Sequence, residues 1–220
     1  MRVLVACEYS GRVREAFRRR GFDAWSCDLL PSEDESQHHI QGDCLEAVME
    51  GWDLMVCHPP CTYLATSGLH WNGRIPGRAE KTEESLAFVL ALLSANIKHI
   101  ALENPVGAIG TRVRKPDQII QPYQFGEDAS KATCLWLKNL PPLRPTGFCE
   151  PRIIDGRPRW GNQTDSGQNK LAPSDDRWKE RSRTYQGIAE AMGEQWGRWI
   201  LAQQGAGVRS WPMAAASFQS

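Results

Sequence analysis

The sequence predicts one α/β domain, a mostly parallel β-sheet with helices on both faces. Short apolar, β-branched runs alternate with helical patterns through residues 1–103. This alternation is typical of parallel sheets with right-handed crossovers. The length of 220 residues suits a single domain with a sizeable core. Ligands bind at the carboxyl ends of the strands in such sheets, so a functional site is expected there.

The first helix is predicted between two strands. The run "RVLVAC" at residues 2–7 has the pattern of a buried strand. Ser10 is expected to cap the helix that follows, and Gly21 is expected to end it. The run "FDAWSCD" at residues 22–28 predicts a second strand that ends at Asp28.

A loop, a short helix and a third strand are expected next. Residues 29–42 are polar and predict a loop. Asp43 is positioned to open a short helix over residues 43–51. The run "DLMVC" at residues 53–57 predicts the third strand, which leads directly into the turn "HPPC".

The second half of the chain has a weaker pattern. Strands are predicted at residues 98–103 and 131–138, and a final helix at 187–204. Residues 139–177 are rich in Pro, Gly, Asn and Asp and predict a reduced, irregular segment on the substrate side. Residues 205–220 are expected to form a flexible tail, so the single domain would span residues 1–204. A helix that precedes the fourth strand has one apolar face by spacing, formed by Leu86, Val89, Leu90 and Leu93.

Charge and cysteine content restrict the class of protein. Lys and Arg number 26, as do Asp and Glu, so the formal net charge is zero. This excludes an extended coat for a polyanion but leaves room for a local basic face. No apolar run is long enough for a membrane span, and the first residues read as a strand rather than a signal peptide. The seven cysteines are expected to be reduced thiols in a cytoplasmic protein.

The turn "HPPC" raises the question of what Cys61 does. It could be a buried thiol in a turn, a metal ligand or a nucleophile. Cys57, His58 and Cys61 lie close together, but no second pair of ligands is evident, so no metal site is expected. Glu103 ends the next predicted strand and would reach the same edge of the sheet. A thiol beside a carboxylate favours covalent attack on a ring whose nitrogen must be protonated at the same time.

These residues resemble a known family. "HPPC" followed by "ENP" at the end of a strand is similar to the Pro-Cys and Glu-Asn-Val motifs of the DNA cytosine-5 methyltransferases. Upstream, "ACEYSGRVREAFRRRG" and "GDCLE" resemble the cofactor-binding motifs of that family in the same order. Downstream, "RSRTYQGIAEAM" resembles its closing motif. The match covers residues 1–107 well and thins afterwards, as in short phage and prophage members of the family.

The resemblance implies a Rossmann-like S-adenosylmethionine-dependent fold and methyl transfer to C5 of a cytosine flipped out of DNA. The protein would then work in the cytoplasm of a bacterium or of a phage-infected host cell, with no membrane partner. The resemblance implies catalytic roles for Cys61, Glu103 and Asn104 and substrate contacts for Lys131, Arg181 and Arg183. The implied cofactor-binding residues are Cys7, Glu8, Ser10, Gly11, Asp28, Asp43 and Pro59.

Several departures from the family pattern leave alternatives open. The first loop retains only Gly11 of the usual glycines, His58 replaces a glycine, and Pro105 replaces the valine of Glu-Asn-Val. Residues 139–177 are too few for the usual target-recognition domain, so slight sequence specificity is expected. One alternative is a catalytically silent nucleic-acid-binding module of the same fold. Another is a C5-modifying enzyme that acts on free nucleotides or uses a modified donor.

Overall fold

The computed structural model describes residues 1–174 and 176–207. Its main element is a seven-stranded sheet with the order β3-β2-β1-β4-β5-β7-β6. The pairs β2–β3, β1–β2, β1–β4 and β4–β5 are parallel, and β7 is antiparallel to both β5 and β6. The predicted mostly parallel α/β sheet is therefore confirmed. The strands are β1 (Arg2–Ala6), β2 (Asp23–Asp28), β3 (His39–Gln41), β4 (Leu54–Cys57), β5 (His99–Pro105), β6 (Gln118–Ile120) and β7 (Thr133–Lys138).

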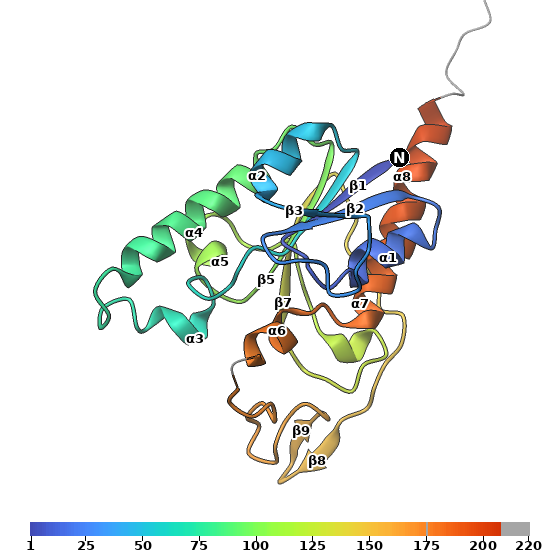
Figure 1. Cartoon of the computed structure of the whole chain (residues 1–220). Coiled ribbons are helices and arrows are strands. Elements are labelled where there is room, and N and C mark those ends of the chain that lie inside the picture. The colour runs from blue at the N-terminus through green and yellow to red at the C-terminus, as the bar shows by residue number, and fades with distance from the viewer. Residues whose placement is uncertain (175, 208–220) are drawn as a thin grey trace, which may run out of the picture.

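Helices cover both faces of the sheet, as predicted (Figure 1). On one face α2, α4 and α5 pack against the strands, and on the other α1, α7 and α8 do so. A π-helical turn (Met192–Trp196) connects α7 to α8. The helices are α1 (Arg12–Arg18), α2 (Cys44–Ala47), α3 (Thr66–Leu69), α4 (Arg78–Leu93), α5 (Ala108–Arg112), α6 (Arg177–Ser182), α7 (Gln186–Ala191) and α8 (Gly197–Gly207), with short 3₁₀ turns at Val48–Glu50 and Pro122–Gln124.

The two cores follow from the alternation of side chains along each strand. Leu4 faces the helices α2, α4 and α5, whereas Val3 and Val5 face α1, α7 and α8. Successive side chains of a strand point to opposite faces, so a strand buried on both faces needs a continuous apolar run. That is the composition of β1 and β4, which lie next to each other in the middle of the sheet.

The strand order reverses between β1 and β4. The chain moves from β1 outward to β2 and β3, then returns to the other side of β1 to form β4 and β5. Ala6 pairs with Cys57 at the carboxyl ends of these two strands. Cys7 and His58 therefore leave the sheet side by side at the switch point. Ligands of open α/β sheets bind in the crevice outside such a point.

Short elements depart from the sequence prediction. The strands β3 and β6 and the helices α3 and α5 were not predicted, since elements of so few residues show no clear periodicity. The strand β5 continues past Glu103 to Pro105, because β7 pairs with it along that stretch. Leu90, predicted on the apolar face of α4, is 47% exposed. The buried stripe of α4 is narrower than predicted and contains Thr82, Leu86, Val89 and Leu92.

Residues 139–174 are largely irregular but contain a hairpin of β8 (Arg152–Ile154) and β9 (Arg157–Arg159). The hairpin lies apart from the main sheet, at the bottom of the view in Figure 1. Trp160 anchors it by stacking on Tyr123, with ring centroids 4.3 Å apart.

At the end of the chain, α8 continues to Gly207, into the predicted tail, and residues 208–220 lie outside the described part. None of the helices that the structure describes is both long and apolar enough to cross a membrane.

Candidate active site

The "HPPC" turn is held at the edge of the sheet by contacts to both neighbouring strands. The His58 N–H donates to the carbonyl of Ala6 at 2.9 Å, which ties the turn to β1. The buried Asn104 donates from Nδ2 to the carbonyl of Pro59 at 2.7 Å, which ties it to β5. Two prolines restrict the backbone further. Cys61 follows this turn as an exposed thiol, whereas Cys57 is buried within β4.

Glu103 and His58 form a buried pair beside the turn. Leu102 pairs with Cys57 in the parallel register of β4 and β5, so the next residue of each strand stands opposite the other. The Nδ1 atom of His58 lies 2.9 Å from Oε2 of Glu103, and their side chains are 7% and 12% exposed. Burial raises the pKa of Glu103, but the hydrogen bond from His58 and the charge of Lys131 outweigh it, and the pKa is lowered overall. Glu103 therefore rests as a carboxylate.

Charged residues from three other parts of the chain affect the pKa of Cys61. Packed protein atoms raise the pKa of this thiol, Lys131 lowers it, Glu103 raises it again, and Arg181 lowers it. The net direction is upward, so the resting form is the thiol. The predicted substrate residues Lys131 and Arg181 therefore lie close enough to act on Cys61, and Lys131 Nζ also donates to the Arg181 carbonyl at 3.1 Å.

Arg183 is placed differently from the other predicted substrate residues. Its guanidinium forms ion pairs with Glu33 and with Glu180. The pair with Glu33 joins the loop after β2 to the segment after α6, while the pair with Glu180 connects that segment to α6. Arg183 thus connects the loop after β2 to α6.

Two adjoining cavities lie at the switch point. The larger has a volume of about 380 Å³ and the smaller about 140 Å³, and Cys7, Asp28 and Pro60 line both. The larger is also lined by Leu29, Asp43, Cys44, Pro59, Glu84, Ser85 and Phe88. The smaller is also lined by Glu8, Tyr9, Ser10, Leu30, His58, Trp178, Ser182 and Thr184. Every predicted cofactor-binding residue except Gly11 thus lines one of these cavities.

Glu8, and not Ser10, caps α1, which corrects the sequence prediction. Oε1 of Glu8 accepts from the Val13 N–H at 2.8 Å, and Oε2 accepts from the Arg14 N–H at 3.2 Å. The Ser10 hydroxyl donates to the same carboxylate at 3.4 Å. Gly11 at the N-cap has φ 71°, a left-handed conformation that turns the chain so that Glu8 can reach the helix. Burial raises the pKa of Glu8 against the opposing charge of His58 and the two N–H groups.

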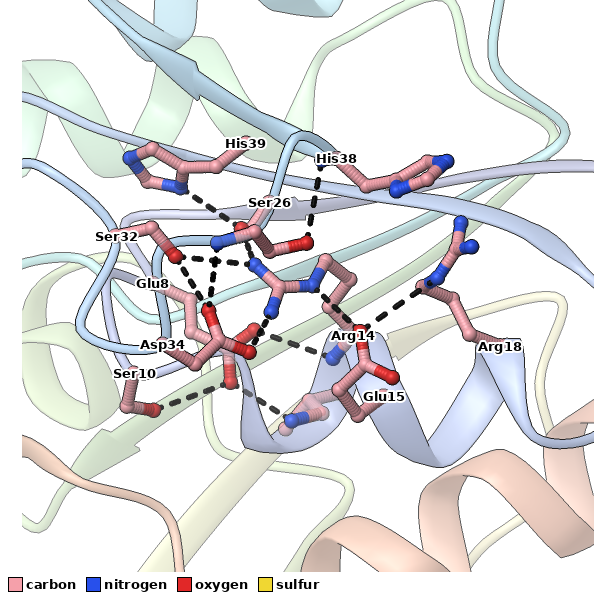
Figure 2. Close-up of polar contacts among 12 residues, drawn as sticks. Glu8, Ser10, Arg14, Glu15, Arg18, Ser26, Ser32, Asp34, His38 and His39 are labelled. Carbon is pink, nitrogen blue, oxygen red and sulfur yellow. Dashed lines mark hydrogen bonds and ion pairs between the residues drawn. The ribbon is translucent and has the colours of Figure 1, made fainter.

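Figure 2 shows that the fully buried Arg14 reaches from α1 toward Ser26 and Asp34. Its guanidinium donates to the Ser26 hydroxyl at 2.8 Å and pairs with Asp34. These contacts hold the loop after β2, whose residues Leu29 and Leu30 line the cavities. In the sequence, Arg14 is followed by Glu15, and two adjacent charged residues ordinarily indicate the exposed face of a helix.

Asp28 and Asp43 each bind a nearby backbone N–H and also face the larger cavity. Asp28 accepts from the Leu30 N–H at 3.0 Å, and Asp43 caps α2 by accepting from the Leu45 N–H at 2.8 Å. Both residues also line the larger cavity. Burial raises the pKa of Asp28 against the hydrogen bond from Leu30.

The segment around α6 contributes residues that were not predicted as site residues. Trp178, Ser182 and Thr184 line the smaller cavity. The Tyr9 hydroxyl donates to the Lys179 carbonyl at 3.0 Å, and Arg12 donates to the Thr184 carbonyl at 2.9 Å, so the segment is bound to the first loop. The signal that could have identified Ser182 and Thr184 was the resemblance of "RSRTYQGIAEAM" to a closing motif, which does not include Trp178.

Within residues 1–174 and 176–207, no group of three or more His, Cys, Asp or Glu side chains could hold a metal ion. No protein-family model matches the chain, and no curated protein does.

Three solved structures that the chain resembles are methyltransferases. The Dnmt2 methyltransferase of S. pombe is 16% identical, with 64% of this chain and 52% of that chain covered and a TM-score of 0.44. A DNMT2 variant of Spodoptera frugiperda is 17% identical, with coverage of 72% and 57% and a TM-score of 0.41. An rRNA methylase from Escherichia coli is 16% identical, with coverage of 62% and 56% and a TM-score of 0.38. The chain spans little more than half the length of these structures.

Proposed function

We propose that this protein is an S-adenosylmethionine-dependent methyltransferase that methylates C5 of cytosine in DNA through a covalent cysteine intermediate. One observation carries the proposal. Exposed Cys61 directly follows the turn of His58, Pro59 and Pro60, and it is close enough to Glu103 for that carboxylate to affect its pKa. His58 pairs with Glu103 and lines the smaller cavity. A nucleophile, a carboxylate and a binding crevice at one strand edge are the parts that this chemistry needs.

The lining of the two cavities fits the proposed cofactor. Carboxylates at the carboxyl end of β2 and at the start of α2 can accept hydrogen bonds from ribose hydroxyls and from an adenine amino group. Leu29, Phe88 and Pro59 provide apolar walls for a flat base. Glu8 in the smaller cavity suits the cationic amino group of the cofactor's amino-acid end. S-adenosylmethionine bound here would supply an electrophilic methyl group.

Cys61 acts as the nucleophile in the proposed reaction. Its sulfur forms a bond to C6 of the cytosine, and the electrons of the C5–C6 double bond move to C5. Bound S-adenosylmethionine would give its methyl group to this C5 as its sulfur–methyl bond breaks, and it would leave as S-adenosylhomocysteine. Loss of the C5 proton to a base returns the electrons to the C5–C6 bond and expels Cys61 as a thiolate. Because the resting thiol must first lose its proton, the cations Lys131 and Arg181 support the step by favouring the thiolate.

Glu103 acts on the opposite side of the ring. A hydrogen bond to N3 that carries a proton prevents negative charge from accumulating on the base as the sulfur adds. The contact of Asn104 with Pro59 keeps the strand that bears Glu103 in place against the turn that bears Cys61. A rigid edge suits a reaction whose rate depends on the alignment of the sulfur, the ring and the methyl donor.

Incubation of the purified protein with radiolabelled S-adenosylmethionine tests the function. DNA, structured RNA and dCMP are offered separately, and the products are identified by mass spectrometry of nucleosides. We expect 5-methylcytosine in DNA. Label only in RNA or only in dCMP would contradict the DNA substrate and would leave the C5 chemistry standing.

A second candidate is a silent nucleic-acid-binding module. The replacement of a glycine by His58 and the Glu8-capped first loop favour it, since both change the region that would hold the cofactor. Calorimetry separates the two candidates. Binding of DNA without binding of S-adenosylmethionine would support the module and overturn the enzyme.

A further inference from the structure

His58 lies between the catalytic carboxylate and the smaller cavity. Its Nδ1 contacts Glu103 at 2.9 Å, and the residue lines the cavity that also contains Glu8. Its Nε2 is buried and has no hydrogen-bond partner among the described residues. Buried polar atoms are nearly always paired, because leaving one unpaired forfeits its hydration without compensation. The unpaired Nε2 therefore points to a ligand group.

The surroundings of the ring determine what kind of group this is. Glu103 rests as a carboxylate, which only accepts hydrogen bonds, so the proton between the two side chains belongs to Nδ1. A ring that carries this proton alone presents Nε2 as an acceptor. Glu8, Asp28 and Tyr9 line the same cavity, and the charge of Lys131 lowers the pKa of Glu103. A cavity lined with acceptors selects a cationic donor.

We propose that His58 is a positioning residue that connects the cofactor site to the catalytic carboxylate. Nδ1–H holds Glu103, and Nε2 accepts a hydrogen bond from the amino group of the cofactor's amino-acid end. The inference rests on the proposed function, because it takes S-adenosylmethionine as the ligand. Cofactor binding then fixes the imidazole ring, and through the ring it fixes the carboxylate that must meet the cytosine.

Two substitutions of His58 separate the role of Nδ1 from the role of Nε2. In His58→Asn the amide nitrogen can replace Nδ1, but nothing reaches the cavity. We expect the affinity for S-adenosylmethionine and for S-adenosylhomocysteine to fall by roughly tenfold, since a hydrogen bond to a charged group is lost. In His58→Gln the longer side chain reaches the cavity but no longer holds Glu103. Its affinity should stay within roughly threefold of wild type, and the pKa of Glu103 should rise because its donor is gone.

Calorimetry measures the affinities, and carbon-13 spectra of the carboxyl groups measure the titration of Glu103. His70→Asn, at an exposed position outside both cavities, is the matched control and should bind the cofactor as wild type does. Nitrogen-15 spectra of the wild-type histidines add a readout that a purely structural role would not change. S-adenosylhomocysteine should shift the Nε2 resonance of His58, while adenosine alone should not.

An unmoved Nε2 resonance, or wild-type affinity in His58→Asn, would overturn the inference. Wild-type protein that binds the cofactor with the expected shift but methylates no cytosine would overturn the proposed function and leave the role of His58 supported. Wild-type protein that binds neither S-adenosylmethionine nor S-adenosylhomocysteine would overturn the cofactor assignment and this inference together.

Discussion

Cys61 and Cys57 lie close in sequence but in different surroundings, one exposed after the Pro-Pro turn and one buried inside β4. Cys61→Ser should reduce product formation below roughly a tenth of wild type, because a serine hydroxyl is a far weaker nucleophile at neutral pH. Cofactor affinity should remain near wild type. Methyl transfer from labelled S-adenosylmethionine and calorimetry provide the two measurements.

The control for this substitution is Cys57→Ser. Its sulfur is buried among apolar side chains, so the variant should lose stability, by about 1–3 kcal/mol, while the folded fraction keeps its activity. Substantial turnover by Cys61→Ser, or loss of chemistry in well-folded Cys57→Ser, would reverse the assignment of the nucleophile.

The lowered pKa of Glu103 leads us to expect that the stability of the protein depends on pH. Its pKa in the folded protein lies below the ordinary value of 4.5. The ionised form therefore contributes stability that is present above pH 4.5 and is lost as the pH falls through the lower folded value. Urea unfolding at neutral pH and at several values below 4.5 should show wild type losing stability relative to Glu103→Gln. Glu46→Gln, at an exposed position, controls for the change in net charge. An equal loss in wild type and Glu103→Gln would refute the ionised, His58-bound carboxylate.

At the scale of elements, the first loop depends on a glycine that faces a buried arginine. Gly11→Ala forces a side chain into the left-handed region, which costs about 1–2 kcal/mol, and its Cβ would collide with the Arg14 guanidinium. Gly21→Ala shares the positive φ but meets open space. We expect Gly11→Ala to unfold at a lower urea concentration than Gly21→Ala and to bind the cofactor more weakly. Equal stability of the two variants would show that Arg14 yields without cost.

The start of α2 combines helix capping with cavity lining. Asp43→Ala should destabilise the protein by about 1 kcal/mol because the cap is lost, whereas Asp43→Asn should keep it. Both should weaken S-adenosylmethionine binding by about 1–3 kcal/mol, because the amide offers the cavity a donor in place of the second acceptor oxygen. We expect Asp28→Ala and Asp28→Asn to weaken S-adenosylmethionine binding in the same way. Calorimetry showing wild-type affinity in the asparagine variants would leave both residues with capping roles only.

At the scale of the whole molecule, the short segment 139–177 limits how many DNA base pairs the proposed enzyme could recognise. Reading a base pair takes side chains at the groove edges, with roughly 1–3 kcal/mol of discrimination from each good contact. Asn162 instead bonds to Ser130, and Gln163 accepts from the Trp160 N–H, so both help to anchor the segment. The side chains that the segment mainly offers for contacts with phosphates or bases are Arg144, Arg152, Arg157, Arg159, Asn162, Gln163, Gln168 and Asn169.

We therefore expect a cytosine target with weak flanking preferences, at most roughly two or three positions. Bisulfite sequencing of DNA modified in vitro measures this. Strict dependence on one longer motif, read without a partner protein, would contradict the expectation.

Much of the architecture was predictable because it depends on local patterns. The alternation of apolar runs with helices predicted the central strands and the crossover helices, and the turn "HPPC" lies where β4 was predicted to end. Cys7, Asp28 and Asp43 follow strands or open helices, so their position at one edge of the sheet follows from parallel topology alone. The strands β3 and β6 were missed because they exist only through pairing with neighbours.

Other features were decided by tertiary structure. Glu8 displaces Ser10 as the cap of α1 because the left-handed turns at Cys7 and Gly11 bring its carboxylate over the helix. Arg14 is buried because Ser26 and Asp34 converge on it from another part of the chain. His58 meets Glu103 only through the register of β4 and β5. A sequence pattern reports a residue's near neighbours along the chain, whereas these contacts join residues that only the packed sheet brings together.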